Sequence, residues 1–252
     1  MEIVFIGSGG GRINLIKQVR ATGGFRINSS TANIHVDPGP GALVHSVKMK
    51  QSPLSLDCVI VTHNHTDHVT DAQVMVEGMT HYSLKKAGIF IASRNVIDEN
   101  GISPWHQSKI EQLYIAKWGE KKEFKTKNGS FEIEIIELKH EEPTVFGFRL
   151  HLEGKTIGYV SDTEYFEGLG ESFGGCDILI INCIKPETDA YGGHLTVKGV
   201  IGILEKARPK EAVITHMGMK MLRLGPANVA KEIQEKTNVR TIAAKDGLKL
   251  EL

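Results

Sequence analysis

Four side chains between positions 63 and 68 carry the clearest chemistry in this sequence. His63, His65 and His68 supply imidazoles and Asp67 supplies a carboxylate, directly after the apolar run 58–61. Alternate side chains at the end of a strand point to one side, so His63 and His65 can converge on one ion. Asp67 and His68, further round the turn, would then face a second ion. Imidazole and carboxylate ligands without thiolate are typical of zinc, manganese or iron, so the pattern predicts a metal centre with two ions.

Three further residues at the ends of strand-like runs could complete such a centre: His140, Asp162 and His216. Each also has an ordinary alternative. His140 could be a solvated histidine, Asp162 could cap a turn, and His216 could be a hydrogen-bonded histidine at a strand end. Five other histidines have no comparable spacing and are expected to be structural or surface residues: His35, His45, His81, His106 and His151.

The order of these residues resembles the metal-binding pattern of the metallo-β-lactamase fold superfamily, from position 37 to position 216. The resemblance implies that Asp37 braces the metal loop and that the fold is a four-layer αββα sandwich of two mixed sheets. It also implies two ligand groups that share Asp162 as a bridge: His63, His65 and His140 for the first ion, and Asp67, His68 and His216 for the second.

Apolar runs of strand length alternate with amphipathic stretches along the chain. Predicted helices cover residues 69–86, 197–207 and 227–236, the second stopped by Pro209 and the third preceded by Pro226. Strands flanked by helices favour an α/β fold in which helices cover two packed mixed sheets. The glycine-rich residues 7–11 do not match a nucleotide-binding motif, so a tight turn is the favoured interpretation. Predicted strands cover residues 2–6, 34–37, 57–61, 89–92, 131–138, 145–152, 155–161, 177–182, 212–215 and 248–252.

Length and composition favour one domain over residues 1–252, because the ligand candidates are scattered over the chain and must meet at one point. The 30 basic and 30 acidic residues balance, so no global attraction to nucleic acid is expected, although a local basic patch stays open. Three cysteines, with no signal-peptide pattern and no run of membrane-spanning length, predict buried thiols in a soluble, cytoplasmic protein without a membrane partner.

His194 is the residue that discriminates between reactions. It lies in the segment Gly-Gly-His-Leu-Thr at positions 192–196, which resembles the phosphodiesterase branch of the superfamily, including RNase Z and phosphoribosyl cyclic phosphodiesterases. The resemblance implies that His194 is at the active site without being a core ligand and assists the phosphate or the leaving group. A simple role before a helix, with Thr196 as the N-cap, is the alternative. The chain departs from this branch at Gly218, where serine is common.

A phosphodiester reaction assigns a role to each group. Two cations about 3.5–4 Å apart can lower the pKa of a shared water and clamp a non-bridging phosphate oxygen. Asp67 would orient the resulting hydroxide, and His194 would supply a proton or positive charge to the leaving alkoxide. Lys220 and Arg223, just after His216, could add phosphate contacts, although a solvated basic turn is an equal alternative.

The sequence therefore predicts a hydrolase with two divalent metal ions that acts as a phosphodiesterase on a small nucleotide-like or RNA substrate. Zinc is favoured, with manganese or iron as alternatives. The other functions left open are tRNA 3′ processing of the RNase Z type and lactone or thioester hydrolysis. No segment has the glycine- and proline-rich basic composition of an RNase Z arm. Residues 100–112, which include Trp105, are the best candidate insertion. A homodimer also stays open.

Overall fold

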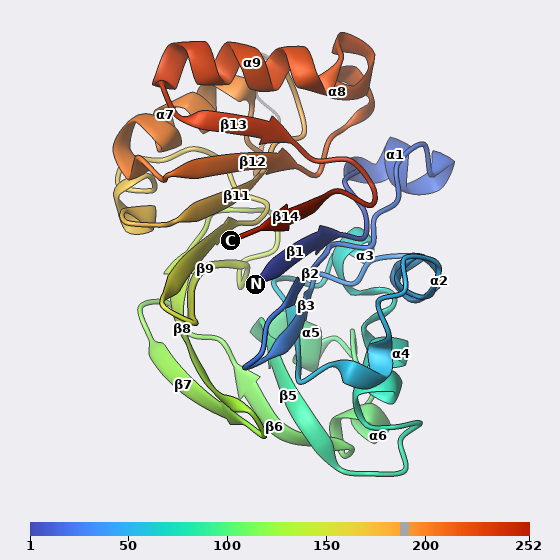
Figure 1. Cartoon of the computed structure of the whole chain (residues 1–252). Helices are drawn as coiled ribbons and strands as arrows, with labels where there is room; N and C mark the ends of the chain where they lie inside the picture. Colours follow the sequence, from blue (N-terminus) through green and yellow to red (C-terminus); the bar gives the residue numbers. More distant parts are fainter. Residues whose placement is uncertain (187–191) are drawn as a thin grey trace.

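The computed structural model describes residues 1–186 and 192–252, and in this part of the chain two seven-stranded sheets pack face to face with helices on their outer faces (Figure 1). This arrangement confirms the predicted α/β sandwich of two mixed sheets. The first sheet has the strand order β14 (Lys249–Glu251), β1 (Glu2–Phe5), β2 (Phe25–Asn28), β3 (Asn33–Val36), β4 (Cys58–Val61), β5 (Ala87–Ala92) and β6 (Ile110–Ile115).

The second sheet is built mainly from the other half of the chain. Its strand order is β13 (Arg240–Ala243), β12 (Glu211–Thr215), β11 (Ile178–Asn182), β10 (Lys155–Val160), β9 (Phe146–Leu152), β8 (Gly129–Glu137) and β7 (Lys121–Thr126). Strands β3 to β6 are parallel in the first sheet, and β10 to β13 are parallel in the second. Ligands in open α/β sheets bind beyond the carboxyl ends of parallel strands. We therefore expect the functional residues to lie in the segments that follow the carboxyl ends of these strands.

Helices cover the outer face of each sheet. Over the first sheet lie α1 (Gly11–Lys17), α2 (Ala42–Lys48), α3 (Thr66–Val69), α4 (Ala72–Met79), α5 (Arg94–Asp98) and α6 (Pro104–Gln107), with the short 3-10 turn η1 (Pro53–Ser55). Over the second lie α7 (Val197–Ala207), α8 (Met219–Leu224) and α9 (Pro226–Thr237), with the 3-10 turn η2 (Glu171–Phe173). In the described part of the chain, no helix combines the length and the apolar character needed to cross a membrane.

Strand β4 shows how the core positions the site. Cys58 and Ile60 belong to the core between the two sheets, whereas Val59 and Val61 belong to a second apolar cluster beneath α4. A strand buried on both faces reads as a continuous apolar run, which is why residues 58–61 lack alternation. Apolar side chains therefore pack against both faces of β4, which fixes the position of the strand immediately before His63. The three cysteines are free and buried, as predicted.

The predicted helix 69–86 is wrong in extent. Val69 ends α3, α4 starts only at Ala72 and ends at Met79, and residues 81–83 all have positive φ angles. The helical spacing of apolar residues continues to Leu84. This side chain is 83% exposed, so it does not pack against the core in a way that would stabilise a longer helix. Helices 197–207 and 227–236 match α7 and α9 closely.

Residues 100–112 belong to the connection that leads from β5 into the edge strand β6 of the first sheet. They contain α6, which packs against α4, and lead directly into β6. Trp105 is 54% exposed at this place, with Lys109 Nζ 5.2 Å from its ring centroid. The segment thus has the structure of a connection between β5 and β6.

Candidate metal centre

All predicted ligands lie in segments that directly follow strands. The segment after β4 carries residues 63–68, of which Asp67 and His68 belong to the short helix α3. His140 follows β8, Asp162 follows β10 and His216 follows β12. Because these strands come from both sheets, the segments approach each other from opposite sides. The structure thereby brings together seven residues that are spread over more than 150 positions of sequence.

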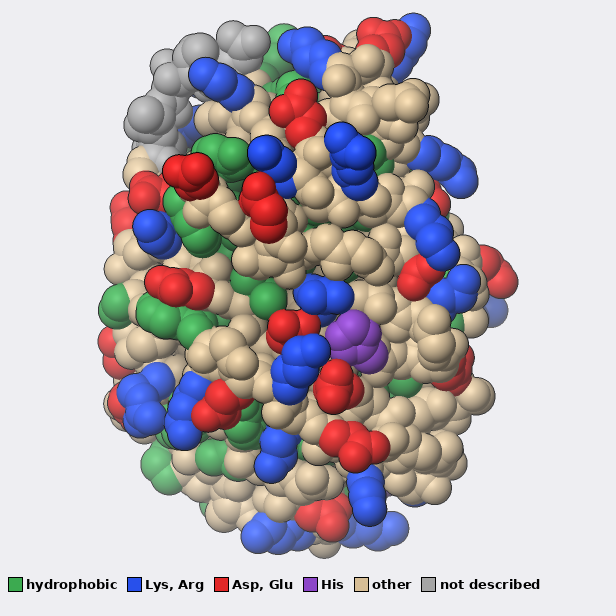
Figure 2. Space-filling view, turned by 90° about the vertical axis from the view of Figure 1, so that its left-hand side faces the viewer, with side chains coloured by type: hydrophobic (Ala, Val, Ile, Leu, Met, Phe, Trp, Pro, Cys, Tyr) green, Lys and Arg blue, Asp and Glu red, His purple; other side chains and the backbone are tan. Residues whose placement is uncertain are grey.

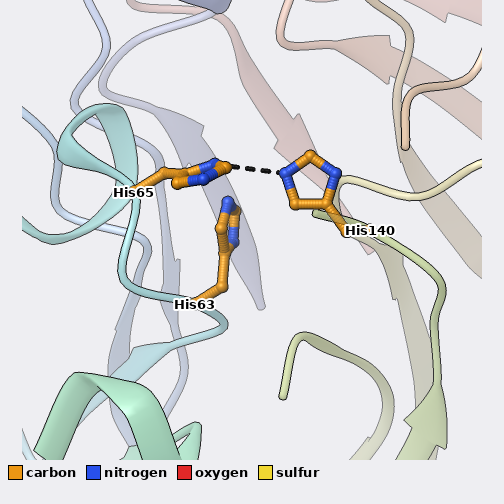
Figure 3. A group of neighbouring side chains, drawn as sticks. All are labelled: His63, His65 and His140. Carbon is orange, nitrogen blue, oxygen red and sulfur yellow. Dashed lines mark hydrogen bonds between the residues drawn. The ribbon is translucent and has the colours of Figure 1, made fainter. Parts of the chain in front are cut away.

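The first ligand group consists of His63, His65 and His140. His65 Nδ1 lies 3.1 Å from His140 Nε2, and the three rings surround one space, as Figure 3 shows. His140 Nδ1 donates a hydrogen bond of 2.6 Å to the Gly193 carbonyl, and His63 Nδ1 lies 3.1 Å from the Thr62 hydroxyl. These contacts orient the rings so that the other nitrogen of His63 and His140 faces the centre.

The second ligand group consists of Asp67, His68 and His216. His216 Nε2 lies 3.2 Å from Asp67 Oδ2 and 3.1 Å from His68 Nε2. On its other side, His68 Nδ1 hydrogen-bonds with Asp37 Oδ2 at 3.0 Å. His68 and His216 are buried, whereas Asp67 is partly exposed toward the cleft.

Asp162 lies between the two groups. Its Oδ2 is 3.4 Å from His68 Nε2 and 3.9 Å from His63 Nε2, so one oxygen faces a member of each group. Its Oδ1 accepts a hydrogen bond of 2.7 Å from Asn182 Nδ2. This buried carboxylate therefore lies next to a histidine of each group.

The donor set fits divalent ions. His63 Nε2 is fully buried and has no hydrogen-bond partner among the described residues, which is costly unless the nitrogen binds something else. Two imidazole pairs, His65–His140 and His68–His216, also bring their nitrogens to 3.1 Å. Nitrogen ligands of a tetrahedral zinc ion, about 2.0–2.1 Å from the metal, lie roughly 3.3 Å apart.

Protonation follows from burial and charge. Burial, together with nearby His68, lowers the pKa of His63 well below its ordinary value, and burial with nearby His140 lowers the pKa of His65. Burial alone would raise the pKa of Asp162, but neighbouring imidazoles led by His216 hold it well below its usual range. His63 and His65 are therefore held as neutral imidazoles and Asp162 as an ionised carboxylate, the forms that bind metal.

His68 and Asp67 form the charged part of the cluster. Burial would lower the pKa of His68, but the carboxylates of Asp162 and Asp37 raise it well above the ordinary value. Burial would raise the pKa of Asp67, but the hydrogen bond with His216 and the charge of His68 lower it strongly. A bound cation can replace the proton on His68, because the same anions would attract either charge.

Asp37 has the bracing geometry that the resemblance implied. Its carboxylate accepts hydrogen bonds from the Thr62 backbone N–H at 2.7 Å, the Thr62 hydroxyl at 2.8 Å and the Tyr159 hydroxyl at 2.9 Å. With His68, four donors from three segments meet on this buried group. Asp37 thus ties the loop after β4 to the second sheet.

A cavity of about 440 Å³ opens onto both ligand groups. His194 lies in its wall, with Nδ1 3.5 Å from Asp162 Oδ2 and its ring centroid 4.8 Å from that of His140. Burial lowers the pKa of His194 to about 4, against the opposing effect of Asp162. Lys220 also lines the cavity, whereas Arg223 is exposed on α8 and is not one of the lining residues.

Sequence reasoning missed the part played by the glycine loop, residues 7–11. The Gly10 backbone lies so close to the His216 ring that any side chain there would collide with the imidazole. Gly11, at φ +76°, donates its N–H to Asp67 Oδ2 at 3.1 Å, and Arg12 follows it in the cavity wall. The signal in the sequence was four glycines within five residues after a strand, a composition that permits close backbone approach.

Comparison with known proteins places the chain among metal-dependent hydrolases. Residues 32–217 match the family model described as a β-lactamase superfamily domain. The uncharacterized protein MJ1374 of Methanocaldococcus jannaschii is 38% identical over 259 residues, covering 100% of this chain and 95% of the relative. A UPF0173 metal-dependent hydrolase of Pyrococcus abyssi is 23% identical over 87% of this chain and 92% of its own length. The exodeoxyribonuclease WalJ of Streptococcus pneumoniae is 23% identical over 88% and 84%.

Solved structures share the fold over the whole chain. The metallo-β-lactamase fold protein YhfI of Bacillus subtilis superposes with a TM-score of 0.80 at 20% identity, covering 100% of this chain and 99% of that one. The short form of human tRNase Z gives a TM-score of 0.73 at 16% identity, over 100% and 99%. A diphosphatase of the PhnP family gives 0.72 at 16% identity, over 100% and 98%. These likenesses establish the αββα architecture.

Proposed function

This chain belongs to the β-lactamase superfamily and is a metal-dependent hydrolase of the metallo-β-lactamase fold, and on that premise we propose that it is a phosphodiesterase with two metal ions. The two ligand groups and the shared Asp162 support this ion number. Zinc, with manganese or iron as alternatives, suits ligands that are only imidazole and carboxylate. Two such ions would activate a water molecule and neutralise charge on a non-bridging phosphate oxygen.

In this proposal, His63, His65 and His140 hold one ion, and Asp67, His68 and His216 hold the other, with Asp162 between them. The hydrogen bonds to Thr62, Gly193 and Asp37 keep the imidazoles in the required tautomers. Asp67 also lines the cavity, so its partly exposed side chain can accept a hydrogen bond from the attacking water.

The observation that carries the phosphodiesterase assignment is the position of His194. It contacts Asp162 but belongs to neither three-residue group, and it faces the cavity where a substrate would lie. With a pKa of about 4, its imidazole is neutral at pH 7 and can donate one N–H. A bound phosphate anion would raise that pKa, because opposite charge favours the protonated form.

Phosphodiester hydrolysis adds water to phosphorus, breaks the bond to the leaving oxygen and places one proton on that oxygen. His194 is the titratable group of the cavity wall best suited to supply it. Lys220, from α8, can contact a phosphate oxygen from the same wall. Arg223, which is exposed outside the cavity, could reach only a longer substrate that extends along α8.

A small or medium phosphodiester suits the cavity better than a folded RNA. A volume of about 440 Å³ matches a ligand of nucleotide size. The chain carries 30 basic and 30 acidic residues, and on the one face drawn in Figure 2 the two kinds of side chain are interspersed, so neither observation indicates an extended basic surface for a nucleic-acid backbone. The exodeoxyribonuclease relative and the tRNase Z neighbour both act, by their names, on phosphodiester bonds.

The test is the hydrolysis of a dinucleotide phosphodiester, whose leaving alkoxide needs a proton, by metal-loaded protein, wild type beside His194→Ala. We expect the variant to be slower by about 10²–10⁴-fold, the usual contribution of a general acid. His151→Ala is the matched control, because His151 lies on β9 at the hairpin end and contacts Thr156. Two bound ions without any phosphodiester cleavage would redirect the assignment to lactone or thioester hydrolysis. Accurate trailer cleavage of a tRNA precursor would establish the tRNA-processing alternative.

A further inference from the structure

Asp246, in the loop between β13 and β14, fixes the glycine loop from the far end of the chain. Ser8 donates its backbone N–H and its hydroxyl to Asp246 Oδ1 at 2.9 and 2.7 Å. Ala21 donates its N–H to Oδ2 at 2.8 Å, and Arg20 Nη1 donates to the Ser8 hydroxyl at 2.8 Å. Both carboxylate oxygens are therefore used to join the glycine loop to the segment that follows α1.

The glycine loop in turn touches two residues of the second ligand group. Gly11 donates its N–H to Asp67 Oδ2, and the Gly10 backbone lies against the His216 ring. The backbone beside His216 is tied to the same loop, because Met217 donates to the Ser8 carbonyl at 2.9 Å and accepts from Gly10 N–H at 3.2 Å. Any displacement of the loop must therefore move Asp67, His216 or both.

The first ligand group is held independently of this loop. His63 and His140 bond with the Thr62 hydroxyl and the Gly193 carbonyl. Among the described residues, the glycine loop makes no hydrogen bond to His63, His65 or His140. The chain from Asp246 through Ser8 and Gly10 thus reaches one half of the metal centre.

We propose that Asp246 is a positioning residue that sets the affinity of the second ligand group for its ion and leaves the first group unaffected. The inference rests on the proposed ligand set. Metal ligands must be placed to within about 0.2 Å, so a small shift of the glycine loop is enough to weaken binding. Asp246 touches no ligand itself, and its effect passes entirely through the backbone of residues 8–11.

The test is stepwise Zn²⁺ binding to metal-free full-length protein, measured by competition with a chromophoric chelator. Asp246→Asn keeps the shape and one acceptor oxygen but cannot accept from both Ser8 and Ala21. Asp177→Asn is the matched control, because Asp177 also accepts a backbone N–H, from Thr156, and pairs with Lys210 at the opposite end of the second sheet. Thermal unfolding of both variants reports any general loss of stability.

We expect wild type and Asp177→Asn to bind two ions. Asp246→Asn should bind one of the two ions at least about 10-fold more weakly than wild type, which is the lower end of the loss seen when a hydrogen-bond partner of a metal ligand is removed. In an Asp67→Ala background, which disables the second group, Asp246→Asn should leave the affinity for the remaining ion within about twofold. Ser8→Ala removes the two hydroxyl contacts, with Asp246 and Arg20, but keeps the backbone N–H bond to Asp246, so it should show the same selectivity with a smaller loss.

Unchanged affinity for both ions in Asp246→Asn would overturn the inference, as would equal weakening of both. A further loss in the Asp67→Ala background would also overturn it. A wild-type protein that binds fewer than two ions would refute the proposed ligand set and this inference together, whereas two ions with an unaffected Asp246→Asn variant would refute the inference alone.

Discussion

The two ligand groups of the metal centre contain similar side chains but are held in different ways. In the first group, His63 and His140 are oriented by a hydroxyl and a carbonyl, both neutral, and His65 and His140 are partly exposed. In the second group, the buried His68 lies between the carboxylates of Asp37 and Asp162. The first group is a pocket of imidazoles held by neutral partners, and the second is a cluster of charges around the buried His68.

The difference teaches where each group is vulnerable. Neutral hydrogen bonds from adjacent residues can hold an imidazole with little help from the rest of the fold. Buried charges stabilise a site only when their partners are well placed, and removing one partner leaves the other uncompensated. We therefore expect distant substitutions to weaken the second group more than the first, and replacement of the shared carboxylate to weaken both groups strongly.

Replacing that shared carboxylate should have the largest effect. Asp162→Ala removes a carboxylate that lies beside both His63 and His68, so we expect at most one ion per chain and a hydrolysis rate lower by on the order of 10³-fold. Metal content by atomic emission and the phosphodiester assay measure the two effects. Asp57→Asn, at the opposite end of β4, serves as the control. Two retained ions would rule out the bridging role.

Removing the brace should separate the two groups. Asp37→Asn leaves at least one of its four donors without an acceptor, and His68 is a direct partner whereas His63 is reached only through Thr62. We expect about 10–100-fold weaker binding at the second group and a smaller loss at the first. Stepwise zinc titration of the variant beside Asp57→Asn measures this, and equal losses at both groups would contradict the distinction drawn between them.

The ligands in residues 63–68 could be predicted, because they lie close together in the sequence directly after a buried strand. Residues 63–68 lie in one turn after a buried strand, and the sequence alone shows that His63 and His65 alternate. The later residues His140, Asp162 and His216 each had ordinary alternatives as single positions. The structure brings all of them into one cluster, and the resemblance of their order had indicated that arrangement.

The supports of the second group could not be predicted in the same way. Ser8 and Asp246 are separated by 238 positions, and neither belongs to a pattern with chemical meaning. Strand β2 was missed because Arg26 interrupts its apolar pattern, although this guanidinium is buried and bonded to Asn28, Ser52 and Ser55. Contacts that depend on how distant segments meet leave no periodicity for sequence analysis to detect.

Strand β7 was missed for the opposite reason. At the edge of the second sheet it buries only Phe124, and its Lys and Glu side chains face solvent. Charged residues on an edge strand hinder pairing with another chain, but they also remove the apolar signal by which strands are recognised. The fold class was therefore confirmed from the buried strands, while the edge strands β6, β7 and β13 were not predicted and the edge strand β14 was.

The smallest expected effect, and the most direct test of the comparison, is the proton count on metal binding. The pKa of His68 is raised, so at pH 7 this residue is protonated until a cation displaces its proton. The pKa values of His63 and His65 are lowered, so both imidazoles are already neutral at pH 7 before a metal ion binds. We expect about one more proton released at the second group, whose affinity should rise up to about tenfold per pH unit above 6.5 until His68 deprotonates. Calorimetry in buffers of different ionisation enthalpy counts the protons for each step, and equal release at both steps would show that the two groups are not electrostatically distinct.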